Sequence, residues 1–172
     1  MSFNLKSSNL FLQKLLKNNT IIPNVLKEKV IEIRRVTKVT KGGKKLSFRT
    51  IIVIGDEKGL VGVGIAKAND VLTAFKKAKM NGLKNLIKVP VSKFLSIPSN
   101  ISGYYSSSRI ILHPLKEGSG IIAGGAIRII LEIAGIKNVM AKQLGSKNLL
   151  NNSRATILAL NSLALKHKNF YK

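Results

Sequence analysis

The residues with the clearest potential for chemistry form a glycine-rich stretch ahead of an apolar helical segment. Gly118-Ser-Gly120-Ile-Ile-Ala123 matches the spacing of a dinucleotide-binding turn, with alanine as the third small residue. Such a turn places a phosphate at the N-terminus of the helix that follows. The pattern also requires a carboxylate about 20 residues further on, to bind the ribose, whereas Glu132 is the last acidic residue of the chain. The spacing therefore favours tight turns and close helix packing over a nucleotide site.

Other catalytic or metal-binding constellations are scarce. The chain has no cysteine, which excludes disulfides, thiolate metal ligands and cysteine nucleophiles. Its two histidines, His113 and His167, cannot assemble a metal site without carboxylates, and the sequence holds only seven acidic residues. No apolar run is long enough to span a bilayer. We therefore expect no catalytic residue, no metal, no cofactor, no small-molecule substrate and no membrane association.

The charge balance points to a polyanionic partner. Thirty Lys and Arg residues stand against the seven acidic ones, which gives a net charge of +23 for 172 residues. Self-repulsion on that scale opposes compaction unless a polyanion neutralises it, and nucleic acid rewards such an excess by counterion release. Phe and Tyr total nine and Trp is absent, so base stacking is not expected to be the main mode of binding. Backbone and shape recognition of folded RNA fits better.

The first half of the chain is predicted to form an antiparallel sheet. Residues 30–40 mix β-branched and charged side chains, and residues 46–54 alternate in the manner of a strand. Gly42 and Gly43 lie between them, and a glycine pair permits the positive φ angles of a tight hairpin turn. A third strand is predicted over residues 60–67, where two glycines leave room for another backbone to approach closely.

A helix is predicted after this sheet. Asn69 or Asp70 can cap its N-terminus. A stripe at helical spacing is expected to pack on the sheet, while lysines project elsewhere. The stripe consists of Val71, Ala74, Phe75 and Ala78.

Basic residues concentrate in this half of the chain, with fifteen basic residues against four acidic ones between Lys29 and Lys88. Several crowd about the hairpin tip with no acid among them, and repulsion makes that arrangement costly without a partner. We predict that the hairpin, its two glycines and the following strand and helix bind RNA. The candidate residues are Arg34, Arg35, Lys38, Lys41, Gly42, Gly43, Lys44, Lys45, Arg49, Lys67, Lys76 and Lys77.

The second half is predicted to continue as strand, glycine turn, buried helix and strand. Residues 110–112 form the first apolar run, and Gly135 stands where a left-handed C-terminal cap of the buried helix would fall. A β-like segment follows over residues 136–144. Asn148 is a plausible N-cap for a last helix that ends near residue 165. The packing face expected for that helix consists of Ala155, Leu158, Ala159, Ser162 and Leu165.

These elements suggest a domain order. Residues 1–27 form a basic arm with a short helix that Pro23 ends, and residues 28–88 form the first domain. The proline- and serine-containing stretch 89–108 is expected to be the linker and first strand region, with a strand fragment around residues 89–91. A second domain is predicted over residues 109–166, and residues 167–172 form a basic tail.

Three blocks of sequence resemble a known family. RRVTKVTKGGKKLSFR (residues 34–49), GDEKGLVGVGIAKA (55–68) and EGSGIIAGGAIRIILEIAGIKNVMAKQLGSKN (117–148) are together similar to the ribosomal protein S5 family of the bacterial-type small subunit. The ending AKQLGSKN looks most like the cyanobacterial and plastid branch. The abundance of Asn, Lys and Ile also fits a plastid-encoded gene, with a bacterial cytoplasmic origin as the alternative.

The resemblance implies an α+β fold. The first domain would resemble a double-stranded-RNA-binding domain, with a three-stranded antiparallel sheet plus helix. The second would be an α+β domain with a left-handed βαβ crossover. It also implies binding to small-subunit (16S-type) rRNA, contacts with ribosomal proteins S4 and S8, a position near the mRNA entrance, and an influence on decoding accuracy. The family's basic hairpin loop falls here on Lys38, Lys41, Gly42, Gly43 and Lys44, with Arg35 on the strand leading in.

Two other functions stay open at this point. A small-molecule kinase with the same left-handed fold would use the loop from Gly118 to Gly125 for ATP phosphates. That chemistry needs magnesium ligands and a base, and only Glu117, Glu132 and His113 lie nearby in the sequence. The other is a double-stranded-RNA-binding module that acts away from the ribosome.

Overall fold

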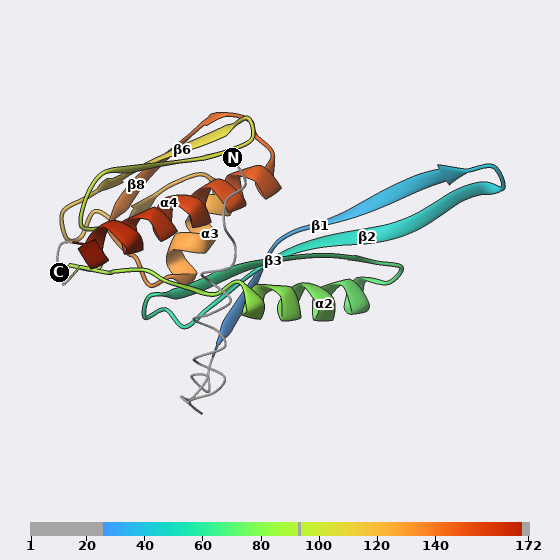
Figure 1. Ribbon diagram of the computed structural model, residues 1–172, viewed down its shortest axis with the longest axis horizontal. Helices are drawn as coiled ribbons and strands as arrows, with labels where there is room; N and C mark the ends of the chain where they lie inside the picture. Colours follow the sequence, from blue (N-terminus) through green and yellow to red (C-terminus); the bar gives the residue numbers. More distant parts are fainter. Residues whose placement is uncertain (1–25, 93, 170–172) are drawn as a thin grey trace.

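Two four-stranded sheets organise the protein. The computed structural model describes residues 26–92 and 94–169, with sheet orders β1-β2-β3-β4 and β5-β6-β8-β7 (Figure 1). Helix α2 packs on the first sheet and helix α4 on the second, while helix α3 contacts α4, strand β7 and strands β1, β2 and β3 of the first sheet. The predicted α+β class is confirmed. The helix predicted within the N-terminal arm and the end of the predicted basic tail lie outside the described residues.

The first sheet is antiparallel throughout. Its strands are β1 (Lys27–Thr40), β2 (Gly43–Gly55), β3 (Leu60–Ala68) and β4 (Ile87–Lys88). The first three match the predicted strands, and the two-residue β4 adds a fourth.

The strand fragment expected around residues 89–91 is wrong, because the pairing with β3 comes earlier. Leu60 and Val61 pair with the two residues of β4. The amide of Val89 still donates to the carbonyl of Gly59 at 2.7 Å. The next residue, Pro90, has no N–H to donate, so the ladder stops there.

Helix α2 (Val71–Lys84) packs on one face of this sheet. Ala74 and Ala78 are fully buried, whereas Val71 and Phe75 are half-buried, so the predicted stripe does face the sheet. The helix comes so close that a Cβ on Gly64 would lie 1.9 Å from the carbonyl oxygen of Ala78. This is the close backbone approach expected from the strand glycines.

The predicted cap of α2 is only partly correct. Asp70 occupies the N-cap position, but its side chain makes no capping hydrogen bond. The hydroxyl of Thr73 instead donates to the carbonyl oxygen of Asp70 at 3.0 Å.

The second unit begins with a hairpin and contains a βαβ element. Its elements are β5 (Ile101–Tyr105), β6 (Ser108–Pro114), β7 (Ile121–Ile122), α3 (Gly125–Ile133), β8 (Val139–Gly145) and α4 (Leu149–Asn169). Strands β7 and β8 are parallel neighbours with α3 between them in the chain. Gly135 has φ = 81°, as predicted for the cap that ends α3.

Helix α4 begins as predicted and buries Ala155 and Ala159 of the predicted packing face, but not the two leucines. The side-chain oxygen of Asn148 accepts a hydrogen bond from the amide of Leu150 at 3.1 Å, which confirms the N-cap. Leu158 and Leu165, both assigned to the packing face, are 43% and 58% exposed. The helix also continues one turn past the predicted end, to Asn169.

Small polar residues take the place of those leucines on the buried face. The hydroxyl of Thr156 donates to the carbonyl of Asn152 at 2.8 Å, and that of Ser153 donates to the carbonyl of Leu149 at 2.6 Å. Because these bonds satisfy the hydroxyls inside the helix, burial costs little. The buried face consists of Asn152, Ser153, Ala155, Thr156, Ala159, Leu160 and Leu163.

One hydrophobic cluster runs through both units. Ile51 and Val53 of β2 belong to the same buried cluster as Ile127 and Ile130 of α3 and Leu160 of α4. Apolar area buried across the boundary stabilises the two units against each other. The shared core therefore gives the first sheet a fixed base, from which the ends of β1 and β2 extend.

Candidate nucleic-acid interface

The far ends of β1 and β2 form a hairpin that projects from the body of the protein, and Figure 1 shows it as a long two-stranded arm. We call residues 33–50 the hairpin arm. Thr40 pairs with Gly43 across a two-residue loop of Lys41 and Gly42. Gly43 has φ = 132°, in the region that only glycine adopts readily. The tight turn predicted from the glycine pair is confirmed, and it sets the register of the whole arm.

That register places like charges directly opposite each other. Arg34 faces Arg49, and Lys38 faces Lys45. Side chains of directly opposed residues lie on the same face of an antiparallel pair, where like charges destabilise the pairing. Arg49 in turn faces Lys67 on β3. Five of the predicted residues thus share one sheet face, which we call the basic face.

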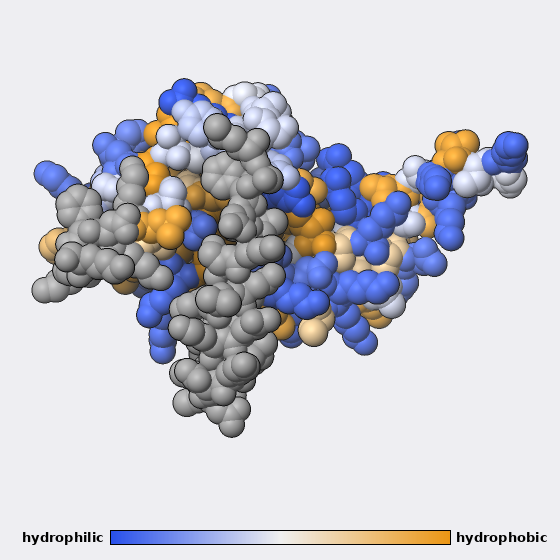
Figure 2. All heavy atoms as spheres, viewed as in Figure 1, coloured by the Kyte–Doolittle hydropathy of each residue, from blue (hydrophilic) through white to orange (hydrophobic). Residues whose placement is uncertain are grey.

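The opposite face of the arm is mixed. Arg35 and Lys44 lie on it, together with Ile33, Val39 and Leu46. The three apolar side chains are 49%, 71% and 50% exposed, respectively. Figure 2 shows hydrophobic and hydrophilic side chains alternating along the projecting arm. The sequence did not identify these exposed apolar side chains as part of the arm's surface. Alternation of Leu46 and Phe48 with polar residues is typical of a strand that has one face in the core.

The sheet lies between the basic face and the two candidates on helix α2. Gly64 lies against α2, so Lys67, three positions along β3, points to the other side of the sheet. Lys76 and Lys77 are exposed on α2 itself. Nine of the predicted residues therefore lie in the hairpin arm, Lys67 lies beside Arg49 on β3, and Lys76 and Lys77 form a separate pair on α2.

In the part of the chain that the structure describes, carboxylates pair with basic residues at the root of the arm (residues 27–34 of β1 and Arg49 of β2), but not at its tip (residues 38–45). Glu32 pairs with Arg34 at 2.8 Å and with Arg49 at 3.5 Å, Lys27 pairs with Glu57 at 2.8 Å, and Lys79 pairs with Glu28. Among the described residues, Lys38, Lys41, Lys44 and Lys45 have no ion-pair partner. The scarce acidic residues leave the tip as an uncompensated cationic surface.

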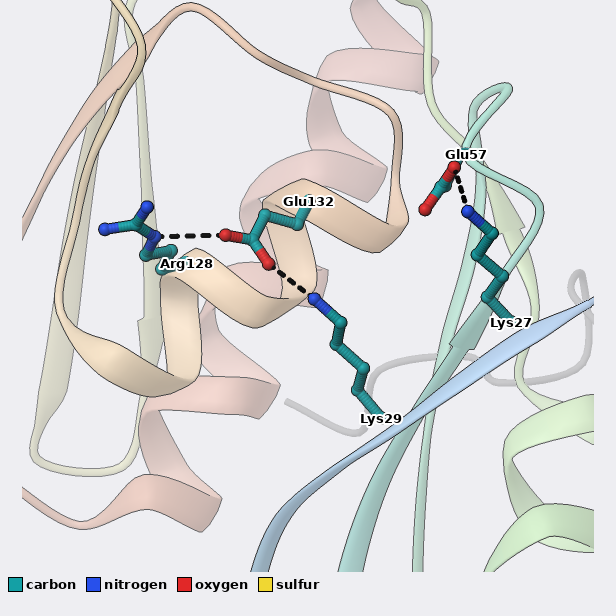
Figure 3. A network of polar contacts seen from close by, with 5 residues as sticks. All are labelled: Lys27, Lys29, Glu57, Arg128 and Glu132. Atoms are coloured by element: carbon teal, nitrogen blue, oxygen red, sulfur yellow. Dashed lines mark hydrogen bonds and ion pairs between the residues drawn. The ribbon is translucent and has the colours of Figure 1, made fainter.

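A second ion-pair network fixes the root of the arm to the other unit. Glu132 of α3 accepts from Lys29 of β1 at 2.7 Å and from Arg128 at 3.0 Å (Figure 3). Close by, the amide of Glu57 donates to the carbonyl of Ile133 at 3.0 Å. The hydrogen bond from Lys29, followed by that from Arg128, lowers the pKa of the Glu132 carboxyl below its ordinary value of 4.5. No local sequence pattern could have predicted a contact between residues 103 positions apart.

The glycine-rich stretch that starts at Gly118 forms turns, as the sequence favoured. Gly118 and Gly120 both have positive φ, and the loop leads through β7 to α3. Within residues 26–92 and 94–169, no three His, Asp or Glu side chains gather closely enough to hold a metal ion. No helix in that same part of the chain is long and apolar enough to cross a membrane.

An α+β scaffold that projects a cationic, solvent-exposed hairpin is typical of proteins that bind RNA through its phosphates. Comparison with known proteins specifies it further. Residues 26–90 match the model of the ribosomal protein S5 N-terminal domain, and residues 103–168 match that of the C-terminal domain. The chain belongs to the ribosomal protein S5 family, and it is a structural ribosomal component and not an enzyme.

Three relatives illustrate the similarity. The small ribosomal subunit protein uS5c of Phaeodactylum tricornutum is 58% identical over 170 residues, covering 96% of this chain and 94% of the relative. The uS5c of Thalassiosira pseudonana is 62% identical over 84% of this chain and 83% of the relative. The protein uS5 of Nostoc punctiforme is 56% identical over 79% and 78%. Neither the family match nor these relatives support the kinase-like alternative.

The opposition of Lys38 and Lys45 can be tested on the free protein. We expect Lys45→Glu to slow amide exchange in the arm, because it replaces a repulsive pair with Lys38 by an attractive one worth about 0.2–1 kcal/mol. The same variant should bind RNA more weakly. Lys45→Gln is the matched control and should show about half of each effect. Hydrogen exchange followed by NMR measures the first quantity, and faster exchange in Lys45→Glu would contradict the assigned register.

The Glu132 network yields a pH-dependent test. Because the folded-state pKa of Glu132 is lowered, the network stabilises the protein above the carboxyl's ordinary pKa and is lost as the pH falls through the folded-state value. Glu132→Gln should therefore lower the free energy of unfolding by about 1 kcal/mol at pH 7. The difference from the unmodified chain should vanish in acid. Urea unfolding between pH 3 and 7 measures this, with the exposed Glu117→Gln as control. A difference that persists unchanged in acid would rule out the ion pairs as its cause.

Proposed function

We propose that the hairpin arm of this S5-family protein reaches between segments of small-subunit rRNA and neutralises their phosphates. The observation that carries this proposal is the pairing of Lys38 with Lys45, beside a tip whose other lysines have no ion-pair partner among the described residues. Such an arrangement costs stability in the free protein, and phosphate between the side chains turns the repulsion into attraction.

The geometry suggests how the arm would fit RNA. A Cβ added at Gly42 or Gly43 would meet no atom within 4 Å, so the turn is open and slim. Without side chains at these two positions, RNA can approach the backbone closely. Phosphate contacts from such an arm fix position and orientation without reading the base sequence. Lys76 and Lys77 on α2 would contact a different RNA segment from the basic face, because the sheet lies between them.

We also propose the cellular setting and the protein neighbours. The relatives named uS5c, from algae such as Phaeodactylum tricornutum, support a place in plastid ribosomes, with a bacterial cytoplasm as the alternative. The resemblance to the S5 family supports ribosomal proteins S4 and S8 as neighbours, a site near the mRNA entrance, and a role in decoding accuracy. Leu158 and Leu165 lie seven residues apart on α4 and are exposed, which gives that helix an outward apolar stripe suited to a protein contact.

Charge reversal at the tip tests the arm. Lys41→Glu with Lys44→Glu should weaken binding to small-subunit rRNA. It should also reduce the slope of log K against log salt by about 2, since each lost phosphate contact removes about 0.9. Fluorescence anisotropy between 50 and 300 mM salt measures both quantities.

The matched control makes the same change in net charge on the other unit, as Lys116→Glu with Lys137→Glu. A nonspecific effect of net charge would lower affinity equally in both double variants. Equal loss, or an unchanged salt slope in the tip variant, would exclude the arm as the principal phosphate contact.

A single engineered cysteine tests the protein contact. The chain has no cysteine, so Leu158→Cys carries a cross-linker at one place on α4. In reconstituted small subunits we expect cross-links to S4 or S8, identified by mass spectrometry. Leu72→Cys, exposed on α2, controls for random labelling. Cross-links from position 158 to rRNA alone would contradict this assignment.

A further inference from the structure

Among the described residues, nothing covers one face of the second sheet. Exposed and buried residues alternate along β5, β6 and β8. The inner residues, such as Gly103, lie against α4, where a Cβ on Gly103 would be 2.4 Å from the carbonyl oxygen of Ala155. The helices thus cover one side of the sheet (Figure 1). The residues between the inner ones form what we call the open face.

Strand register arranges the open face in rows. Tyr104 of β5 is opposite Arg109 of β6, which is opposite Leu144 of β8. In the neighbouring row, Ile111 of β6 is opposite Lys142 of β8. Opposed residues of adjacent strands lie within reach of one another on one face. An aromatic ring, a guanidinium and an ammonium group therefore occupy one corner of this sheet, far along the chain from the hairpin arm.

The charge of this corner has one sign. Strands β5, β6, β7 and β8 contain no acidic residue. The Glu132 carboxylate is already bound to Lys29 and Arg128. Neither Arg109 nor Lys142 has an ion pair within the described part of the chain.

The Tyr104–Arg109 pair at the corner lies open to solvent. The guanidinium carbon of Arg109 lies 5.1 Å from the centre of the Tyr104 ring, and Tyr104 is 55% exposed. The protein has a second Arg–Tyr pair with the same spacing, Arg154 over Tyr105. There the guanidinium also donates to the tyrosine oxygen, and Tyr105 is packed against the core, so that pair is structural. The Tyr104–Arg109 pair has no such interior role.

We propose that the open face is a second RNA-contacting surface, on which one unstacked base lies against Tyr104 or the Arg109 guanidinium while Lys142 contacts a neighbouring phosphate. Unpaired RNA bases commonly stack on aromatic rings and on guanidinium planes. Charge complementarity favours RNA over a protein partner. A protein surface usually carries both acidic and basic residues, and the strands of this corner have no carboxylate to pair with the basic ones. The inference goes beyond the proposed function, which concerns phosphate contacts of the hairpin arm.

A single tryptophan can report on this surface alone. The chain has no tryptophan, so Tyr104→Trp is a unique fluorophore at the corner. In the full chain, a 12-residue oligouridylate should quench this fluorescence at 50 mM salt as a base stacks on the indole. Adding Arg109→Gln or Lys142→Gln should weaken the apparent affinity by roughly threefold to tenfold, since each removes one contact to the nucleotide.

Three controls separate the surfaces and the chemistry. Leu158→Trp, on the exposed side of α4, should not be quenched. Lys41→Glu with Lys44→Glu should leave the quenching of Trp at position 104 intact, so that failure of the arm and failure of this proposal are distinguishable. Without the tryptophan, Tyr104→Ala should lower oligouridylate affinity about tenfold in that arm-reversed background.

Other outcomes would overturn the proposal. Absence of quenching by the oligonucleotide would remove the RNA contact. Equal quenching by inorganic polyphosphate would show phosphate binding without a stacked base. Quenching by hexaglutamate but not by RNA would identify the open face as a surface for an acidic protein.

Discussion

The structure depends on the dual character of strand β2. Ile51, Ile52, Val53 and Ile54 are fully buried between α2 and the core shared with the second unit, whereas residues 43–46 at the other end of the strand are exposed. Because the strand is continuous, the apolar end fixes the cationic end in space. A flexible loop with the same charge would lose conformational entropy when it bound RNA. Strand pairing has already fixed the backbone of the arm, so its loss on binding is smaller.

The distribution of carboxylates follows from this arrangement. Lys27, Glu28, Lys29 and Glu32 of β1 participate in five of the six ion pairs among the described residues. These contacts join the root of the arm to the turn after β2, to α2 and to α3. Acidic residues are thus placed where they position the arm, while its tip keeps its full positive charge. A chain with a net charge of +23 can fold around an apolar core and still present phosphate-binding groups, because the lysines of the tip lie in solvent, away from that core.

Local signals in the sequence predicted much of this. The glycine pair predicted the hairpin, Gly64 the close approach of α2, and Asn148 the start of α4. The features that the sequence did not predict depend on tertiary packing. Leu158 looks like a core residue, but α4 approaches β5 through Ala155 and Ala159, which lie against Gly103, and the leucine is left exposed. The opposition of Lys38 and Lys45 required knowing that the loop has two residues, and the Lys29–Glu132 contact joins elements that are distant in the chain.

Hydrogen exchange on the protein free and inside the small subunit tests the central claim most directly, because it reports on the arm and on its root in one experiment. In the free protein, amides that bond across the ladder at residues 38–45 should exchange more slowly than those of an unstructured chain, though faster than the strongly protected amides of residues 51–54. In the assembled subunit the account predicts protection along the whole arm, with little further change at the root. Arm amides that exchange in the free protein as fast as those of an unstructured chain would contradict the claim that the ladder positions the cations before RNA binds. Equal exchange in the two states would contradict the RNA contact itself.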